Sequence, residues 1–367
     1  MAPSTTIHIN PRASSNKTKV QYAPHILSYH KKLPDYNSTP LRPLTDLSAS
    51  TNIPHIFLKD ESSRFGLPSF KILGASWGIH RLLCSHLSLP LDTPLEEVGA
   101  NARRAKVTLV TCTEGNWGRA VARMSRYLTI PAIIVVPGFM DEATEKKISS
   151  ESETVKLIRI EGTYDDAIAE CRRISDRGEA LLVMDTSWAG WEHISRWVVD
   201  GYSTCLLEVD RQIKEQTGGK GITHAICSVG VGSWAQAITE HYKAQTPRAT
   251  VITVEPDTAA CLQASLKADR MTQVNTADTI MCGMNCGTLS SIAWPVLREG
   301  VDAAVTVSDP EAHESVRYLQ DQGLNAGPCG AAPLAALRKL VAAKGADFAD
   351  GIVVLFCTEG NRDYEIP

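Results

Sequence analysis

A glycine-rich loop in the second half of the chain has the composition of a phosphate site. It follows the apolar run 223–228 and consists of Gly230, Val231, Gly232 and Ser233. Small residues let the backbone close around a phosphate, and the first N–H groups of a following helix add partial positive charge. With Ala235 the loop also fits the G-x-G-x-x-A pattern of dinucleotide-binding folds, in which Glu255 would hold the ribose. The loop alone therefore leaves three interpretations open: a phosphate monoester, a dinucleotide, or a tight structural turn.

A lysine at the start of a predicted helix is a candidate nucleophile. Lys71 follows Ser69 and Phe70 and begins an apolar segment that continues to about residue 84. A charged ammonium is costly on a buried helix start unless it is neutralised or bonded. A lysine that reacts with a carbonyl to give an imine escapes this cost, and such lysines are known nucleophiles. The alternative is an exposed lysine on an ordinary first turn.

Two polar turns follow apolar runs and could contact a ligand. The first comes after the run 107–111 and contains Thr113, Glu114, Gly115 and Asn116. Hydroxyl, amide and unpaired N–H groups at a helix start suit a carboxylate, and Glu114 could also move protons. The alternative is an ordinary helix capped by Thr113 or Asn116.

The second polar turn begins at the end of the last apolar run with Cys357 and Thr358. A thiol or hydroxyl in this position could meet a ring nitrogen of a ligand. The alternative is a solvent-exposed turn without a ligand.

The elements that must position these turns alternate between strand and helix. Apolar runs predict strands at 55–58, 107–111, 132–136, 154–160, 181–184, 223–228, 250–254, 303–307 and 351–357. With Ser69 as the first N-cap, helices are predicted at 69–84, 116–127, 142–149, 164–176, 233–244 and 330–343. This order implies parallel sheets, and the predicted fold class is α/β with two of them. The first 50 residues, interrupted by prolines, predict an extended arm with a short helix at 26–32.

Composition excludes several classes of protein. The 367 residues suffice for two domains, and a net charge of −4 without a Lys/Arg block argues against nucleic-acid or membrane partners. No apolar run approaches the roughly 20 residues of a membrane-spanning helix, and residues 1–12 lack the apolar core of a secretory signal. The ten cysteines include no C-x-x-C pair and no flanking histidine at metal-ligand spacing. We therefore expect a cytoplasmic protein with reduced thiols and no metal site.

In their order along the chain, the segments resemble the fold-type II, or tryptophan-synthase-like, pyridoxal-phosphate enzymes, and among them the diaminopropionate ammonia-lyase family. The resemblance covers about residues 55–361 and rests on LKDESSRFGLPSFKILGASW, TCTEGNWGRAVA, MDTSWAGWEHISRWVVDGY, SVGVGSWAQA, DTIMCGMNCGTLSSIAWPVL and LFCTEGN. It implies a tryptophan synthase β-like architecture of two parallel-sheet domains. Residues 1–104 would hold the arm and the first part of the large domain, 105–190 the small domain, and 191–367 the remainder of the large domain.

The resemblance implies pyridoxal 5'-phosphate as the cofactor and a role for each segment. Lys71 would form the imine with it, Phe70 would lie beside the ring, and Asn116 would bond the ring hydroxyl. Cys357 or Thr358 would face the pyridine nitrogen, and a neutral partner there would favour elimination. The phosphate would be bound by Gly230, Val231, Gly232 and Ser233.

For the substrate, the resemblance implies that Thr113 and the N–H groups of the turn at Gly115 receive the carboxylate. Asp185, in a D-T-x-W stretch, would bind or deprotonate the distal amine. Glu114 would be the second base, on the face opposite Lys71.

The chain departs from the family pattern in three places. Glu114 and Trp117 stand where the family has aspartate and histidine in T-D-G-N-H-G, and Pro328 lies in a G-P-C-G segment where the family usually has G-E-S-G. The departures lie at substrate and ring positions, whereas the lysine and phosphate positions are kept. We therefore expect retained cofactor chemistry with an altered choice of substrate.

The predicted function is that of a homodimeric lyase. It would eliminate ammonia, or another group on Cβ, from a short amino acid such as 2,3-diaminopropionate, and release a 2-oxo acid and ammonia. A β-replacement synthase, a racemase or a dehydratase of the same fold remains an alternative. So do an NAD-dependent dehydrogenase that uses the GVGSWA loop and a cofactor-binding protein without turnover.

Overall fold

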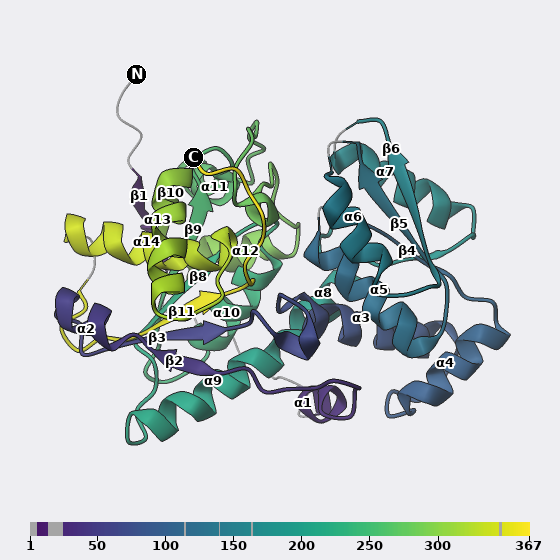
Figure 1. Cartoon of the computed structure of the whole chain (residues 1–367), viewed down its shortest axis with the longest axis horizontal. Coiled ribbons are helices and arrows are strands. Elements are labelled where there is room, and N and C mark those ends of the chain that lie inside the picture. The colour runs from purple at the N-terminus through teal and green to yellow at the C-terminus, as the bar shows by residue number, and fades with distance from the viewer. Residues whose placement is uncertain (1–5, 14–24, 114, 139, 163, 345–346) are drawn as a thin grey trace.

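Two β-sheets with helices on both faces form the framework of the chain (Figure 1). The structure is a computed structural model, and it describes residues 6–13, 25–113, 115–138, 140–162, 164–344 and 347–367. In that part of the chain the strands divide into a seven-stranded and a four-stranded sheet.

The larger sheet combines strands from both ends of the sequence. Its members are β1 (Ile7–Ile9), β2 (Leu41–Pro43), β3 (His55–Asp60), β8 (His224–Ser228), β9 (Thr250–Pro256), β10 (Ala303–Val307) and β11 (Ile352–Cys357). Their spatial order is β1-β10-β9-β8-β11-β3-β2. The central strands run parallel, whereas β1 and β2 pair antiparallel at the two edges. The carboxyl ends of the central strands therefore meet along one edge.

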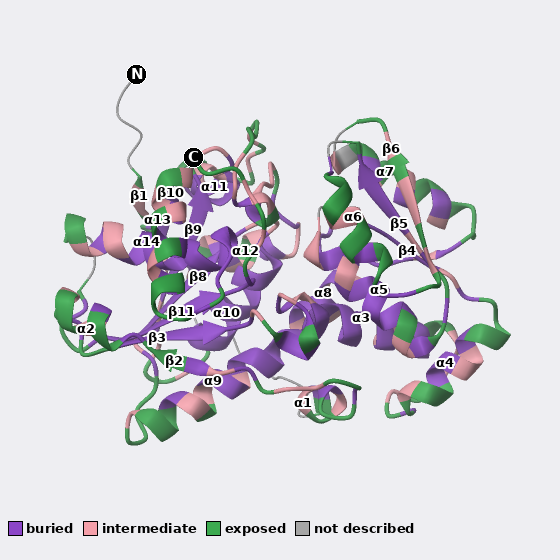
Figure 2. Ribbon diagram, in the orientation of Figure 1, coloured by how far each residue is buried: buried purple, intermediate pink, exposed green. Residues whose placement is uncertain are grey.

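Helices cover both faces of the larger sheet, which explains the nearly continuous apolar sequences of its central strands. These helices include α9 (Ser203–Gln216), α10 (Ser233–Lys243), α11 (Cys261–Ala268), α12 (Ala293–Gly300), α13 (Asp309–Asp321) and α14 (Pro328–Ala343). Every residue of β8, β10 and β11 is buried (Figure 2). The apolar side chains of one sheet face pack with α10 and those of the other face with α14.

The smaller sheet is built from one continuous stretch of sequence. It contains β4 (Leu109–Cys112), β5 (Ala132–Pro137), β6 (Val155–Ile160) and β7 (Leu181–Leu182), all parallel, in the order β6-β5-β4-β7. The helices that cover it are α5 (Asn116–Leu128), α6 (Glu142–Ser149) and α7 (Tyr164–Asp176). Its apolar side chains pack with α5 and α6 on one face and with α7 on the other.

Two helices lie between the sheets and contact each other closely (Figure 1). They are α3 (Lys71–His86) and α8 (His193–Gly201). A Cβ on Gly201 would lie 2.4 Å from the carbonyl oxygen of Leu73, so no larger residue fits there. The remaining helices are α1 (His25–His30), α2 (Thr45–Thr51), α4 (Leu95–Arg104) and the short 3-10 turns η1 (Arg64–Gly66) and η2 (Cys282–Met284).

The α/β class with two largely parallel sheets is confirmed. The elements at 142–149, 164–176 and 303–307 have the predicted bounds, and the other predicted strands and helices are present with shifted ends. The domain boundaries at 104/105 and 190/191 stay predictions.

Two predictions about local structure are wrong. In the described parts of the first 50 residues, 6–13 and 25–50, the chain is not a free extended arm, because β1 and β2 add backbone hydrogen bonds to the two edges of the larger sheet. Three-residue strands are too short to show a sequence period, which explains the error. Ser69 does not cap α3: the helix begins at Lys71 without a side-chain cap, and Ser69 instead bridges to Glu359.

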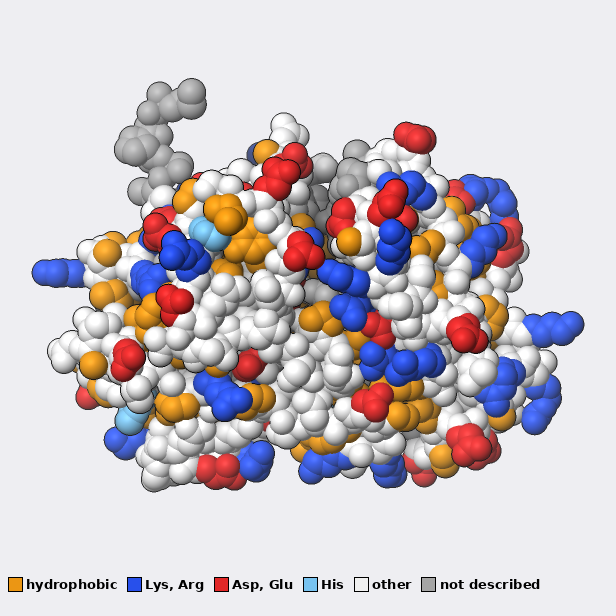
Figure 3. Space-filling model, in the orientation of Figure 1, with side chains coloured by type: hydrophobic (Ala, Val, Ile, Leu, Met, Phe, Trp, Pro, Cys, Tyr) orange, Lys and Arg blue, Asp and Glu red, His pale blue; other side chains and the backbone are white. Residues whose placement is uncertain are grey.

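The described residues contain no helix long and apolar enough to cross a membrane and no cluster of His, Cys, Asp and Glu suited to a metal ion. The ten cysteines form no disulfide in the described chain. On the face shown in Figure 3, positive and negative side chains are interspersed, as a net charge of −4 allows.

A buried ion network holds the segment that leads from β3 to the predicted lysine. Glu208 on α9 lies 2.9 Å from Lys59 Nζ and 2.7 Å from Arg64 Nη2, and Arg64 also binds Glu61 at 2.7 Å. Burial acts to raise the pKa of Glu208, but hydrogen bonds and charge from Arg64 and Lys59 lower that pKa to about 2. The Glu208 carboxylate therefore fixes two cations just upstream of Lys71.

Replacing Glu208 by Gln should destabilise the protein by about 3–5 kcal/mol at neutral pH, because two buried cations lose their shared carboxylate. The folded-state pKa of Glu208 is lowered, so its contribution is present above the unfolded pKa of about 4.3 and is lost as the pH falls toward 2. Denaturant unfolding at several pH values would measure both effects. Glu215→Gln is the control on the same helix, since Glu215 is an exposed partner of Arg211. Equal losses from the two substitutions would contradict a stabilising role for the network.

Candidate active site

The predicted site residues meet in a cavity of about 110 Å³ between the two sheets. The starts of α3, α5 and α10 and the segments after β8 and β11 surround it, so several helix N-termini converge there. Helix N-termini attract anions through their unpaired N–H groups. The predicted residues in its wall are Phe70, Lys71, Thr113, Gly115, Asn116, Asp185, Gly230, Val231, Gly232, Ser233 and Thr358.

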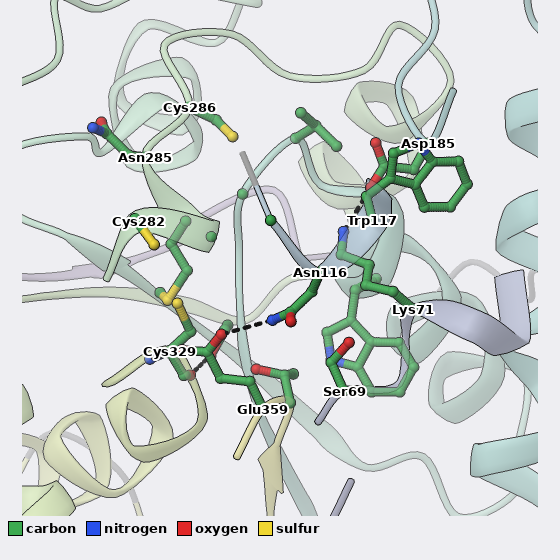
Figure 4. Close-up of a pocket in the computed structure, with 18 of the residues that line it drawn as sticks. Ser69, Lys71, Asn116, Trp117, Asp185, Cys282, Asn285, Cys286, Cys329 and Glu359 are labelled. Atoms are coloured by element: carbon green, nitrogen blue, oxygen red, sulfur yellow. Dashed lines mark hydrogen bonds and ion pairs between the residues drawn. The ribbon is translucent and has the colours of Figure 1, made fainter. Parts of the chain in front are cut away.

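Lys71 and Asp185 form an ion pair across the cavity (Figure 4). Lys71 Nζ lies 2.6 Å from Asp185 Oδ2, and the two residues come from opposite sheets: Lys71 follows β3, and Asp185 follows β7. Burial acts to lower the pKa of Lys71, but the Asp185 carboxylate outweighs it and raises that pKa above its ordinary value. The pair therefore holds an ammonium next to a carboxylate that can accept its proton.

The glycine loop after β8 presents unpaired backbone donors to the cavity. Within the described chain, the N–H groups of Val231, Gly232 and Ser233 donate no hydrogen bond. Gly232 has φ +94°, and a Cβ on Gly230 would lie 2.9 Å from the carbonyl oxygen of Gly283. Glycine is therefore required at both positions, by the left-handed backbone at Gly232 and by the close approach at Gly230. The loop is thus shaped as an anion cradle at the start of α10.

Asn116 is oriented by a buried carboxylate. Its Nδ2 donates to Glu359 Oε2 at 2.9 Å, and the backbone N–H of Cys329 donates to Glu359 Oε1 at 3.1 Å (Figure 4). Glu359 follows β11 and is 4% exposed. Both carboxylate oxygens are therefore engaged, and the amide of Asn116 is fixed facing the cavity.

Thr113 shapes the turn before α5. Its Oγ1 accepts hydrogen bonds from the N–H groups of Gly115 and Gly118, both at 2.9 Å. The hydroxyl hydrogen of Thr113 remains available for an acceptor in the cavity. The Thr113 oxygen thus accepts N–H groups at the start of α5, as the alternative of an ordinary helix capped by Thr113 expects. The contact between the Thr113 hydroxyl hydrogen and a substrate carboxylate stays a prediction.

Cys357 and Thr358, the two residues predicted to face the ring nitrogen of a ligand, differ in their position relative to the cavity. Thr358 lines the cavity. Cys357 does not: its Sγ is buried 3.3 Å from the carbonyl oxygen of Glu359 and against Gly330. Thr358 is therefore the better candidate. Phe70 lies at the wall and packs against Trp234 and Tyr202.

Of the three departures from the family pattern, Glu114 lies outside the described residues. Trp117 turns its ring into the core, where Nε1 donates to Thr111 Oγ1 at 2.8 Å. Pro328 is the first residue of α14 and brings no charge to the site.

The dinucleotide interpretation of the glycine loop fails at Glu255. Its carboxylate accepts the N–H groups of Leu262 and Gln263 at 2.7 and 2.8 Å, at the start of α11, and the side chain is buried. Burial raises the pKa of Glu255 to about 7 although both N–H groups act to lower it. The acid is part of the fold and is not available to a ribose.

Sequence reasoning missed several residues in the cavity wall. They are Tyr164, Cys282, Asn285, Cys286, Cys329, Glu359 and Arg362. Glu359 could have been found, because it adjoins Thr358 in the same polar turn. The others lie at helix starts or in loops where no local pattern marks a site.

The residues present fit pyridoxal phosphate. A lysine amine lies in the same cavity as the anion cradle, and Asn116 and Thr358 can reach a ring between them. Two buried polar atoms nearby, Tyr202 Oη and Asn285 Oδ1, have no hydrogen-bond partner in the described chain. Asn285 lies in the cavity wall, so a bound ligand could satisfy its oxygen, whereas Tyr202 is fully buried beside Phe70.

Comparison with known proteins identifies the family. Residues 32–358 match the family described as pyridoxal-phosphate dependent enzyme. Diaminopropionate ammonia-lyase of Salmonella typhimurium is 33% identical over 302 residues, which cover 80% of this chain and 74% of the relative. The same enzyme of Escherichia coli is 31% identical over 354 residues, 91% of this chain and 87% of the relative.

The fold agrees with these matches. The structure of the Escherichia coli diaminopropionate ammonia-lyase in complex with D-serine superposes with a TM-score of 0.87 at 29% identity, covering 96% of this chain and 93% of that chain. The fold-type II architecture and the pyridoxal-phosphate cofactor are therefore established. The chain belongs to the pyridoxal-phosphate-dependent enzymes and, within them, to the diaminopropionate ammonia-lyase family.

Proposed function

We propose that this enzyme eliminates ammonia, or another leaving group on Cβ, from a short amino acid such as 2,3-diaminopropionate, and yields a 2-oxo acid and ammonia. The observation that carries the proposal is the Lys71–Asp185 pair, 2.6 Å apart in the same cavity as an anion cradle. The relatives that match most of the chain carry the ammonia-lyase name, which favours elimination over β-replacement, racemisation and dehydrogenation.

Pyridoxal phosphate, when bound, withdraws electrons from Cα of the substrate and so stabilises the charge left when the α-proton departs. The N–H groups of Val231, Gly232 and Ser233 would hold its phosphate, Asn116 its ring hydroxyl, and Thr358 its ring nitrogen. Phe70, in the cavity wall, would exclude water from one side of the ring.

Lys71 and Asp185 divide the proton transfers. Asp185 Oδ2 accepts a proton from Lys71 Nζ and so frees the amine to act as nucleophile. The distal amine of the substrate can then take this proton from Asp185 and, as an ammonium, lie beside the Asp185 carboxylate in the place that Lys71 held. The released Lys71 amine can then take the α-proton at Cα.

The turn before α5 binds the substrate carboxylate. The first N–H groups of α5 and the Thr113 hydroxyl hydrogen supply donors, and Gly115, at φ +152°, lets the turn expose them. Glu114, outside the described residues, is proposed as the second base on the face opposite Lys71. Its longer reach compared with aspartate would shift the preference between enantiomers.

The role of Lys71 is tested by borohydride reduction of the purified enzyme, followed by peptide mapping. We expect the pyridoxyl group on Lys71 alone, and Lys71→Ala to lose turnover with diaminopropionate entirely. Lys59→Gln is no suitable control because Lys59 is buried in the ion network, so the exposed Lys147→Gln serves instead and should keep full labelling. A label on another lysine would refute the assignment.

Glu359→Gln should lower kcat about tenfold, because an amide cannot accept from both Asn116 Nδ2 and the N–H of Cys329. We expect the visible absorption of the bound cofactor to shift as well, since Asn116 would turn its amide. Glu365→Gln, in the outer part of the same cleft, is the matched control. A normal spectrum in Glu359→Gln would show that the carboxylate only supports the fold.

We further propose that the enzyme is a cytoplasmic homodimer. The absence of disulfides among ten cysteines supports a reducing compartment, and two-fold dimers are the commonest oligomers. Light scattering at micromolar concentration should give twice the chain mass of 39.9 kDa. A mass of one chain would refute the dimer.

A further inference from the structure

Arg362 stands at the junction of two cavities. It lines the inner cavity together with Lys71 and the glycine loop, and it also lines an outer cavity of about 460 Å³ that includes Lys147 of α6. The two cavities share Gly115, Asn116 and Glu359 in addition to Arg362. A substrate on its way to Lys71 through the outer cavity therefore passes the guanidinium.

The charge of Arg362 has no carboxylate partner in the described chain. No Asp or Glu oxygen among the described residues lies within 4.0 Å of its nitrogens, and its buried Nε makes no hydrogen bond. Nη1 contacts the thiol of Cys282, which is a weak acceptor. An arginine stays protonated at all relevant pH values. The carboxylates of Glu359 and Asp141 act on this charge only from beyond hydrogen-bond distance, so donors of the guanidinium remain open to a ligand.

The two carboxylates that raise the pKa of Arg362, those of Glu359 and Asp141, already accept other hydrogen bonds. Glu359 uses one oxygen for Asn116 and the other for the N–H of Cys329. Asp141 caps α6, with one oxygen bonded to the N–H of Thr144 and the other to its hydroxyl, both at 2.7 Å. The neighbouring start of α14, from Gly327 to Gly330, has no charged side chain. A further anion at Arg362 must therefore come from a ligand.

This anion differs from the α-carboxylate of the substrate. The proposed donors for the α-carboxylate belong to the turn before α5, on the smaller-sheet side of the cavity. Arg362 belongs to the segment after β11, on the larger-sheet side. The cavity thus offers anion sites on two sides, in addition to the phosphate cradle.

We propose that Arg362 binds a second carboxylate, carried on Cβ of the substrate, so that the enzyme acts on 3-substituted aspartates such as 3-hydroxyaspartate. The inference rests on the proposed elimination and defines its substrate class. Elimination breaks Cα–H and Cβ–O, the hydroxyl leaves as water with the proton, and one water is consumed when the product imine is hydrolysed. The net products are 2-oxosuccinate and ammonia.

Serine and 3-hydroxyaspartate are a matched pair of substrates, because they share the leaving group and the α-carboxylate and differ only in the β-carboxylate. We expect Arg362→Gln to lower kcat/KM for 3-hydroxyaspartate roughly 10- to 100-fold, mostly through KM, since a charge-assisted hydrogen bond is lost. The value for serine should change less than about twofold. Arg362→Lys should retain part of the preference because it keeps the charge.

Lys147→Gln is the control for the general charge of the cleft. Its side chain is about half exposed and lies 3.9 Å from Asp363, so its loss should affect both substrates equally and slightly. Equal losses for serine and 3-hydroxyaspartate in Arg362→Gln would overturn the proposal, because the guanidinium would then bind the shared α-carboxylate or support the fold.

Binding of unreactive acids separates this inference from the elimination itself. Calorimetry on the cofactor-loaded enzyme should show succinate binding at least tenfold tighter than propionate, and Arg362→Gln should remove the difference. One outcome is that the enzyme turns over none of serine, 3-hydroxyaspartate and diaminopropionate and yet binds succinate more tightly than propionate. In that case the proposed elimination fails and the anion site stands. Equal binding of the two acids to the unsubstituted enzyme would overturn the anion site.

Discussion

The ion pair between Lys71 and Asp185 is the contact on which the site depends, because it joins residues carried by two different sheets. Lys71 is placed by β3 and by the buried Glu208 network behind it, and Asp185 by the short strand β7. A separation of 2.6 Å requires that the two sheets approach with their strand ends facing. The close packing of α3 on α8, which glycines permit, sets that approach.

Most buried polar groups in and around the cavity have hydrogen-bond partners within the protein. The few that lack a partner are candidates for contact with a ligand. Glu359, Glu255 and Thr113 are engaged with backbone or amide donors. The N–H groups of Val231, Gly232 and Ser233 and the Nε of Arg362 have no acceptor in the described chain. Buried polar groups are rarely left unpaired without a reason, which supports our proposal that a phosphate and a carboxylate bind at these two places.

Two residues that depart from the family pattern, Trp117 and Pro328, also belong to the fold around the cavity. Trp117 is buried, bonds Thr111 through Nε1 and also forms part of the cavity wall. Pro328 begins α14 without a charge, and the helix start instead receives the carboxylate of Glu359 through the N–H of Cys329. The anion of that helix thus comes from a distant part of the sequence, and no ion pair joins this carboxylate to Arg362 within 4.0 Å in the described chain.

The sequence by itself determined the α/β class, most central strands and the turns that carry Lys71, Asn116 and the glycine loop, because apolar periodicity and turn composition are local properties. It did not determine the edge strands β1 and β2, whose pairing depends on distant backbone. Nor could it choose between uses of Glu255, since a buried helix cap and a ribose ligand follow the same strand pattern. The positions of Glu359 and Arg362 were decided only when β11 was inserted between β3 and β8, which brought the end of the chain to the Lys71 cavity.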